Sequence, residues 1–276
     1  MTTADRVPAG LDVTKPNIAR VYDAFLGGKD NFAVDRQVVE FAVQVTPDAP
    51  AGARANRAFL RRVVRYLTAE AGLRQFIDIG SGLPTQGNVH EVAQEIAPDT
   101  RVVYVDNDPL VRAHAQALLA TGPGTVFVTA DLREPETILA SPAVREAIDL
   151  GQPAGLLLFA ILHHINDDED PAKIVARLRD ALAPGSYLAI SSFRMPGPEH
   201  PEDAAKTAAM EKLFNEKLGT GRWRSTDEIQ AWFGDWELLQ PGLVPMPEWR
   251  PDEATVGAVR RDATYYGFVG GVARKP

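Results

Sequence analysis

Two glycines and an aspartate stand together at the end of an apolar run, in a spacing that suits the binding of a ligand. Asp78 lies within the run at residues 76–79, and Gly80-Ser81-Gly82 follows at once. A glycine-rich turn after the first strand of a parallel sheet lets the backbone approach a ligand and offers it amide N–H groups. A glycine turn capped by an aspartate, with no ligand, fits the same five residues equally well. The stretch is therefore a candidate site whose ligand must be decided by other residues.

The type of ligand is narrowed by what the turn lacks. A dinucleotide-binding turn needs a third glycine where Thr85 stands, and the phosphate-binding pattern G-x-x-x-x-G-K-[ST] does not occur. Asp78 beside the turn suits a ligand with positive charge better than it suits a pyrophosphate. S-adenosylmethionine (SAM), with its sulfonium and ammonium groups, is such a ligand. A nicotinamide cofactor is the alternative.

Two further acids follow the next apolar runs. Asp106 comes directly after residues 102–105, and Asp131 follows residues 125–128. An acid at the end of the second strand can accept hydrogen bonds from both ribose hydroxyls of an adenosine, and Asp131 could take the adenine amino group. Carboxyl ends of neighbouring parallel strands meet at one edge of a sheet. The three acids therefore favour an adenosine site over coincidence.

The elements that must position these residues can be predicted from hydrophobic periodicity. Short apolar runs alternate with helical segments, which is typical of a parallel sheet covered on both faces. Right-handed crossovers make such a sheet doubly wound, with a ligand crevice beyond the carboxyl ends of its strands. We therefore expect an α/β, Rossmann-like, doubly wound sheet of seven strands, with the last strand antiparallel. The expected strands lie at 76–79, 102–105, 125–128, 156–159, 187–190, 236–239 and 265–272.

The start of the chain has a helical pattern instead. From Pro16 onward apolar residues recur every three to four positions. Gly27 and Gly28 should end the first helix, and Asp30 or Asn31 should cap the second. Because the sheet is already covered by its own helices, we expect the N-terminal helices to form a cap, or lid, over the cofactor.

The chain is expected to be a single domain without internal repeats, which begins with a loose tail of ten residues. Its expected parts are an N-terminal helical lid (1–72), a cofactor-binding core (73–193), and insert helices with the last two strands (194–276) within the one domain (1–276).

The composition excludes several classes of protein. The 276 residues carry a formal net charge of −8, whereas a nonspecific nucleic-acid binder needs a positive field. The absence of cysteine removes disulfides, thiolate metal sites and thiol nucleophiles. The polar start does not resemble a signal peptide, and no apolar run is long enough to span a bilayer. We expect a cytoplasmic globular protein that binds a small molecule and neither nucleic acid nor a membrane.

Several motifs together resemble class I SAM-dependent methyltransferases: D-x-G-x-G at 78–82, V-D-N-D at 105–108, A-D-L at 130–132 and L-H-H-I at 162–165. More narrowly, the chain resembles a bacterial SAM methyltransferase family of unassigned substrate, from about residue 14 to its end. The motifs that carry this likeness are ARVYDAFLGGKDNF at 19–32, ANRAFLRR at 55–62, GSGLPTQGNVH at 80–90 and GLVPxxxWRP at 242–251.

The resemblance implies where SAM would bind. The glycine turn would face the methionine part, Asp106 the ribose and Asp131 the adenine, and residues of the N-terminal motif would close the pocket. The implied cofactor-binding residues are Tyr22, Gly28, Asn31, Asp78, Gly80, Ser81, Gly82, Asp106, Asn107, Ala130, Asp131, Leu132 and Ala160.

Two histidines follow the fourth apolar run, at the edge where a methyl group would lie. A histidine can remove a proton from a methyl acceptor near neutral pH. Consecutive strand residues point to opposite faces, so His163 and His164 should not serve equally. We take His163 and Tyr22 as the candidate catalytic residues, and a structural histidine bonded to the following loop is the alternative. The histidines lack the i, i+4 spacing of a helical ligand pair, so no metal site is expected.

Arg57, Arg61 and Arg65 share one face of the third predicted helix. A solvated face balanced by the acidic remainder is the favoured interpretation, and a surface for an anionic substrate or partner is the alternative.

These observations favour a SAM-dependent methyltransferase that acts on a small-molecule oxygen or nitrogen acceptor. The acceptor would bind between the lid and the segment 197–224. A SAM-binding sensor without catalysis and a nicotinamide-dependent oxidoreductase are the alternatives.

Overall fold

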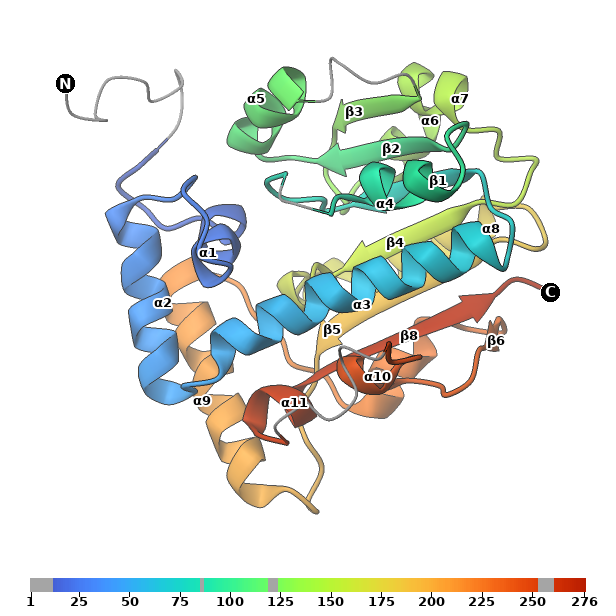
Figure 1. The fold of residues 1–276 in the computed structure, drawn as a ribbon. Helices are drawn as coiled ribbons and strands as arrows, with labels where there is room; N and C mark the ends of the chain where they lie inside the picture. The colour runs from blue at the N-terminus through green and yellow to red at the C-terminus, as the bar shows by residue number, and fades with distance from the viewer. Residues whose placement is uncertain (1–11, 85–86, 119–123, 253–260) are drawn as a thin grey trace.

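One mixed β-sheet forms the centre of the molecule in the computed structural model, which describes residues 12–84, 87–118, 124–252 and 261–276 (Figure 1). Within these ranges the strands are β1 Gln75–Ile79, β2 Arg101–Asp106, β3 Thr125–Thr129, β4 Gly155–Phe159, β5 Tyr187–Phe193, β6 Glu237–Leu238, β7 Val244–Pro245 and β8 Phe268–Arg274. Their order across the sheet is β3-β2-β1-β4-β5-β8-β6, and β7 also pairs with β8. Strands β1 to β5 are parallel, whereas β8 is antiparallel to β5.

The predicted doubly wound α/β sheet with an antiparallel last strand is confirmed, with the two-residue β7 as an addition to the seven expected strands. The last strand begins later than predicted because Tyr265 lies in the helix α11 Ala263–Gly267. The Asp262 carboxylate accepts a hydrogen bond from the Tyr265 N–H at 3.2 Å and caps that helix. The expected loose tail at residues 1–10 and the position of Thr85 lie outside the described residues.

Helices cover both faces of the sheet, so neighbouring residues of one strand enter different cores. On β1, Ile77 packs with Ile138 on one face, and Phe76 packs with Phe59 on the other. The face with Ile77 is covered by α6 Pro135–Ala140, α7 Pro142–Ala147, α8 Pro171–Asp180 and α10 Thr226–Ala231, and the face with Phe76 by α3 Ala49–Ala69, α4 Val89–Ile96 and α5 Pro109–Leu118. No helix in the described ranges is long and apolar enough to cross a membrane.

Three helices form a lobe beyond the carboxyl ends of the strands: α1 Ile18–Phe25, α2 Ala33–Val45 and α9 Pro201–Leu218 (Figure 1). Val21 and Phe25 of α1 share an apolar cluster with Phe214 of α9 and the buried Trp223. Of the N-terminal helices, α3 packs along the sheet, so only α1 and α2 stand over the strand ends. We therefore use the word lid for α1 and α2.

The corner between α1 and α2 is held by buried carboxylates. Asp23 accepts hydrogen bonds from the Asp30 N–H (2.9 Å) and the Asn31 side-chain amide (2.8 Å), so neither residue caps α2 as predicted. The Asp35 carboxylate accepts from the Phe32 N–H at 2.8 Å and caps it instead. A Cβ at Gly28 would lie 2.0 Å from the Asp23 Oδ1, so the close approach requires glycine there. Much of the N-terminal motif therefore builds this corner.

Candidate active site

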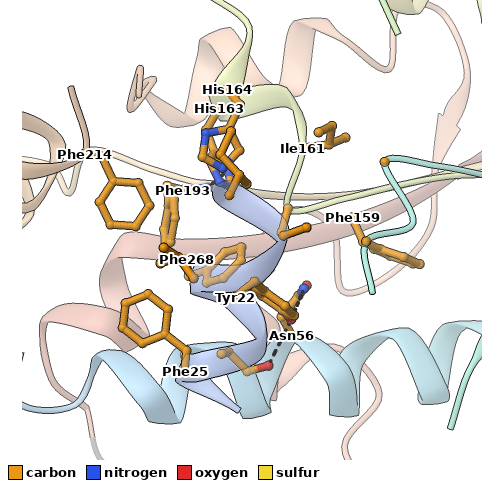
Figure 2. A pocket seen from close by; sticks show the side chains of 18 of the residues that line it. Tyr22, Phe25, Asn56, Phe159, Ile161, His163, His164, Phe193, Phe214 and Phe268 are labelled. Carbon is orange, nitrogen blue, oxygen red and sulfur yellow. Dashed lines mark hydrogen bonds between the residues drawn. The ribbon is translucent and has the colours of Figure 1, made fainter. Parts of the chain in front are cut away.

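A cavity of about 220 Å³ lies above the carboxyl ends of β1, β4 and β5, between the strands and helices α1, α3 and α9. Figure 2 shows Phe214, Phe193 and Phe25 at one side of it and Phe159 at the other. We call the two parts the polar end and the aromatic chamber. The polar end is lined by Asn56, Arg57, Asp78, Gly80, Ser81, Gly82, Asp106, Asn107, Asp108 and Ala160, and the aromatic chamber by Tyr22, Phe25, Phe193, Phe214, Trp223 and Phe268 with His163 and His164.

The turn after β1 takes its shape from two glycines with positive φ. Gly80 (φ 72°) donates its N–H to the Val105 carbonyl at 2.8 Å, and Gly82 (φ 66°) donates to the Asp106 Oδ2 at 2.8 Å. A Cβ at Gly80 would lie 2.6 Å from a carbon of Ile161, whereas one at Gly82 would meet no atom within 4 Å. Gly82 therefore leaves open space in the cavity wall for a ligand.

Two of the predicted acids reach the cavity. Asp78 is buried, and burial raises its pKa to about 7, with Arg57 opposing the rise and Asp106 adding to it. Burial also raises the pKa of Asp106, although its Oδ1 accepts from the Asp108 N–H at 2.9 Å. Two carboxyl groups buried side by side are stabilised in their ionised form by a cationic ligand.

The third acid lies next to the cavity rather than in its lining. Asp131 accepts hydrogen bonds from the Arg133 N–H (2.9 Å) and from the Asn107 side-chain amide (2.8 Å). Partial burial raises the pKa of Asp131, but these hydrogen bonds lower it further, so the pKa lies below its ordinary value. Of its neighbours, Leu132 packs in the core and Ala130 donates its N–H to the Asp106 carbonyl at 3.2 Å. Asn107 thus connects Asp131 to the cavity wall.

A chain of hydrogen bonds fixes Tyr22. Its hydroxyl donates to the Ala53 carbonyl (3.2 Å) and accepts from the Asn56 amide nitrogen (2.9 Å). The Asn56 amide oxygen accepts from the Ser191 hydroxyl (2.6 Å), which accepts from the Ala160 N–H (3.0 Å). Burial raises the pKa of Tyr22. The phenol therefore keeps its proton and ties α1 to the sheet at the boundary between the polar end and the chamber (Figure 2).

Both histidines line the chamber, which the expected strand alternation did not allow. Strand β4 ends at Phe159, and His163 and His164 lie in a 3-10 turn where side chains do not alternate. The His163 Nδ1 accepts the Phe193 N–H at 3.2 Å, so in the neutral ring Nε2 carries the proton. The His164 Nδ1 is buried without a hydrogen-bond partner. Burial lowers the pKa of His163 well below its ordinary value and that of His164 to about 3, so both rings are neutral.

Like Ala130, Asp131 and Leu132, two more predicted cofactor residues lie outside the cavity lining: Gly28 and Asn31, in the corner that Asp23 organises. Among the described residues, no group of three or more potential metal-ligating side chains gathers at one place.

Several lining residues were missed from the sequence. A solvated face is the favoured interpretation for Arg57, Arg61 and Arg65; it fits the two exposed residues Arg61 and Arg65, but Arg57 lines the cavity and donates to the Gly87 carbonyl at 3.0 Å. Its place beside Asn56 in the ANRAFLRR motif was the available signal. The chamber aromatics come from β5, α9, β8 and the loop before α10, and no local pattern connects them.

The doubly wound sheet, the glycine turn and the carboxylates at its edge define a Rossmann-like enzyme that binds a nucleoside-containing ligand. The chain belongs to the S-adenosyl methyltransferase family, whose model matches residues 4–276. It is a SAM-dependent methyltransferase, and SAM is its cofactor. Membership of this family leaves the nicotinamide alternative without support.

Solved structures agree with this assignment. The chain is similar to the crystal structure of a candidate methyltransferase from Thermobifida fusca YX, with 45% identity, 99% of each chain covered and a TM-score of 0.91. It is similar to a DUF574 family protein from Streptomyces avermitilis MA-4680, with 39% identity, 96% of this chain and 99% of that chain covered and a TM-score of 0.89. An O-methyltransferase family protein from Burkholderia thailandensis shares the fold, with 16% identity, 84% of this chain and 61% of that chain covered and a TM-score of 0.53. A search of curated proteins finds no match.

Proposed function

We propose that the enzyme transfers the methyl group of SAM to an oxygen or nitrogen of a small molecule bound in the aromatic chamber. The observation that supports this is the continuity of the cavity, which joins a carboxylate-lined end to an aromatic end. SAM supplies an electrophilic methyl group on a positively charged sulfur. The protein's part is to hold the two reactants in line and to exclude water.

The residues of the polar end fit SAM. Asp78 and Asp106 are buried carboxyl groups with raised pKa values, and a ligand with a sulfonium and an ammonium group favours their ionised forms. We assign the ribose hydroxyls to Asp106 and the cationic methionine part to Asp78. The open space at Gly82 would accept the ligand backbone, and Arg57 would pair with the methionine carboxylate.

The remaining predicted cofactor residues have assigned roles in this proposal. The adenine would lie beside Ala130, Asp131 and Leu132, reached through Asn107, which hydrogen-bonds to Asp131 and lines the cavity. Gly28 and Asn31 would act indirectly, because they shape the corner between α1 and α2 and so position Tyr22 of α1.

A small acceptor is favoured over a macromolecule by the elements that line the chamber. Phe25 of the lid, Phe214 of α9 and Phe193 of β5 all contribute rings to it (Figure 2). A protein or nucleic-acid side group would have to pass between these elements. The formal net charge of −8 also disfavours nucleic acid.

The proposal is tested by following the methyl group. Purified enzyme is incubated with methyl-labelled SAM and a cell extract separated into small-molecule and macromolecular fractions. We expect labelled product in the small-molecule fraction only. Label on protein or nucleic acid would refute a small-molecule acceptor, and tight binding of SAM with no transfer to either fraction would favour the sensor alternative.

A further inference from the structure

The chamber and the polar end differ in charge. The charged residues of the described cavity lining are Arg57, Asp78, Asp106 and Asp108, and all four belong to the polar end. A charged acceptor would lose its hydration in the chamber without gaining an opposite charge. The chamber therefore favours a neutral molecule.

The chamber walls are built from rings in contact with one another. The Phe193 and Trp223 rings are parallel, with centroids 4.7 Å apart, and Phe214 meets Trp223 edge-on at 5.3 Å. Phe268 lies 4.4 Å from Phe193. Ring faces and edges interact best with another planar aromatic ring, because offset and edge-to-face contacts add to the burial of apolar area. The walls thus favour a flat aromatic ligand over a saturated one.

The histidine pair provides the polar part of the chamber. The neutral His163 uses its Nδ1 to accept from Phe193, so it can only donate through Nε2. The buried Nδ1 of His164 has no hydrogen-bond partner, and an unpaired buried polar atom is costly. A ligand hydroxyl, which both donates and accepts, is the group that complements the His163 donor and the unpaired His164 nitrogen.

Cations near the histidines do not change this conclusion, because carboxylates pair with them. Arg133 donates to the His164 carbonyl at 3.4 Å and also pairs with Asp131 and Glu169. Arg224 pairs with Asp167 at 2.7 Å. The neighbourhood of the imidazoles is thus balanced in charge.

We propose that the methyl acceptor is a neutral aromatic compound with a ring hydroxyl, which binds among the chamber rings with its hydroxyl on His164. This inference rests on the proposed function, because it names the class of small molecule that the chamber takes.

The O–H bond of the acceptor is replaced by an O–CH3 bond, and the electron pair of the S–CH3 bond stays on sulfur. The proton passes from oxygen to the His164 imidazole and then to water. The oxygen becomes strongly acidic as its bond to carbon forms, so an imidazole that is hard to protonate in the free protein can still receive this proton.

The test compares four probes that share one carbon skeleton, by calorimetry on the enzyme saturated with S-adenosylhomocysteine (SAH). The probes are 2-naphthol, 2-naphthoate, decahydro-2-naphthol and 2-methoxynaphthalene, which vary charge, aromaticity and the hydroxyl proton in turn. We expect 2-naphthol to bind at least about tenfold more tightly than each of the others. Equal or tighter binding of 2-naphthoate or decahydro-2-naphthol would overturn the acceptor class.

Variants test the role of His164. His164→Leu should reduce the preference for 2-naphthol over 2-methoxynaphthalene to within about twofold, and His164→Asn, which keeps an acceptor atom, should retain part of it. SAH binding serves as the control for folding. The matched control is His200→Leu, because His200 stacks on Tyr266 outside the cavity lining, and it should leave the preference unchanged. A preference that survives in His164→Leu would exclude His164 as the hydroxyl partner.

The two proposals fail in different ways. If 2-naphthoate is the best probe and label still appears on small molecules, the acceptor class is wrong and the proposed function stands. If no probe binds the SAH complex and label appears on macromolecules, the small-molecule function is wrong and the inference falls with it.

Discussion

The polar end and the aromatic chamber are built in different ways, although they share one cavity. Most of the polar end comes from the turn after β1 and the end of β2, whose geometry is fixed by backbone amides and glycines, and α3 adds Asn56 and Arg57. The chamber is assembled from helices and strands at both ends of the chain, and side chains alone give it shape. Cofactor recognition is thus encoded locally in this chain, whereas acceptor recognition exists only after folding.

The largest expected effect is a loss of SAH affinity on substitution of Asp106, a residue of the polar end. Asp106→Ala removes the carboxylate assigned to the ribose, and we expect SAH affinity to fall at least about 100-fold, as for the loss of charge-assisted hydrogen bonds. Calorimetry measures this, with circular dichroism as the test of folding. Asp99→Ala, at an exposed acid that faces Arg74, is the control and should bind SAH normally. Unchanged affinity in Asp106→Ala would contradict the assigned site.

The next effect is a pH dependence that only the polar end should show. The pKa of Asp78 is about 7 in the free protein, and a bound cation favours the ionised form. SAH affinity should therefore fall as the pH drops below about 7, by up to about tenfold per pH unit, and level off above it. The profile of Asp78→Asn should lack this contribution. Identical profiles for the two proteins between about pH 5.5 and about pH 8.5 would show that Asp78 does not titrate with binding.

The same carboxyl group should destabilise the free protein. Its folded-state pKa lies above the unfolded value of 3.8, so its contribution to stability is lost as the pH rises from about 4 to about 7. Asp78→Asn should therefore raise the melting temperature of the ligand-free protein at about pH 8 by roughly 5 °C. A lower melting temperature would mean that the carboxylate is stabilised by contacts within the protein.

A smaller effect distinguishes a ligand contact from backbone strain. Gly82 and Gly72 both have a positive φ, and a Cβ added at either would meet no atom within 4 Å, but only Gly82 lines the cavity. Alanine at either position should cost about 1–2 kcal/mol of stability. Only Gly82→Ala should also weaken SAH binding, by about tenfold. Equal SAH affinity in both variants would exclude close contact at Gly82.

The smallest expected effect concerns the Asp48–Asp262 pair, which joins the starts of α3 and α11 beside the cavity. Asp48, before α3, shares a hydrogen bond with Asp262, before α11, and partial burial together with Asp48 raises the pKa of Asp262 to about 6. Because its pKa is raised in the folded protein, the contribution of Asp262 to stability is lost as the pH rises from about 4 to about 6. Asp262→Asn keeps the cap of α11 and should raise the melting temperature above about pH 6 by about 1–3 °C, with no change in SAH affinity. A change in SAH affinity would show that the Asp48–Asp262 pair is coupled to the polar end.

The sequence allowed the sheet, and the carboxylates and glycine turn of the polar end, to be predicted because their signals are local. Asp78, the glycine turn and Asp106 follow apolar runs, and parallel strands place them at one edge. Asp131 follows the same pattern but turns to Arg133 and Asn107, since hydrogen bonds within its own loop satisfy its carboxylate. Whether it contacts adenine remains a prediction.

The chamber could not be predicted from periodicity. Arg57 of the polar end could not be predicted in this way either, because it shares one face of α3 with arginines outside the cavity lining. The expected choice between His163 and His164 relied on strand alternation, which stops at Phe159. Trp223 and Phe268 look like ordinary core residues in the sequence, and the fold alone brings them together.

The most direct test of the division between the two parts is a crystal structure of the enzyme with SAH. We predict a ribose hydroxyl within about 2.6–3.2 Å of the Asp106 carboxylate, with the sulfur directed toward the aromatic chamber. SAH bound elsewhere, or with its sulfur directed away from His163 and His164, would contradict the account.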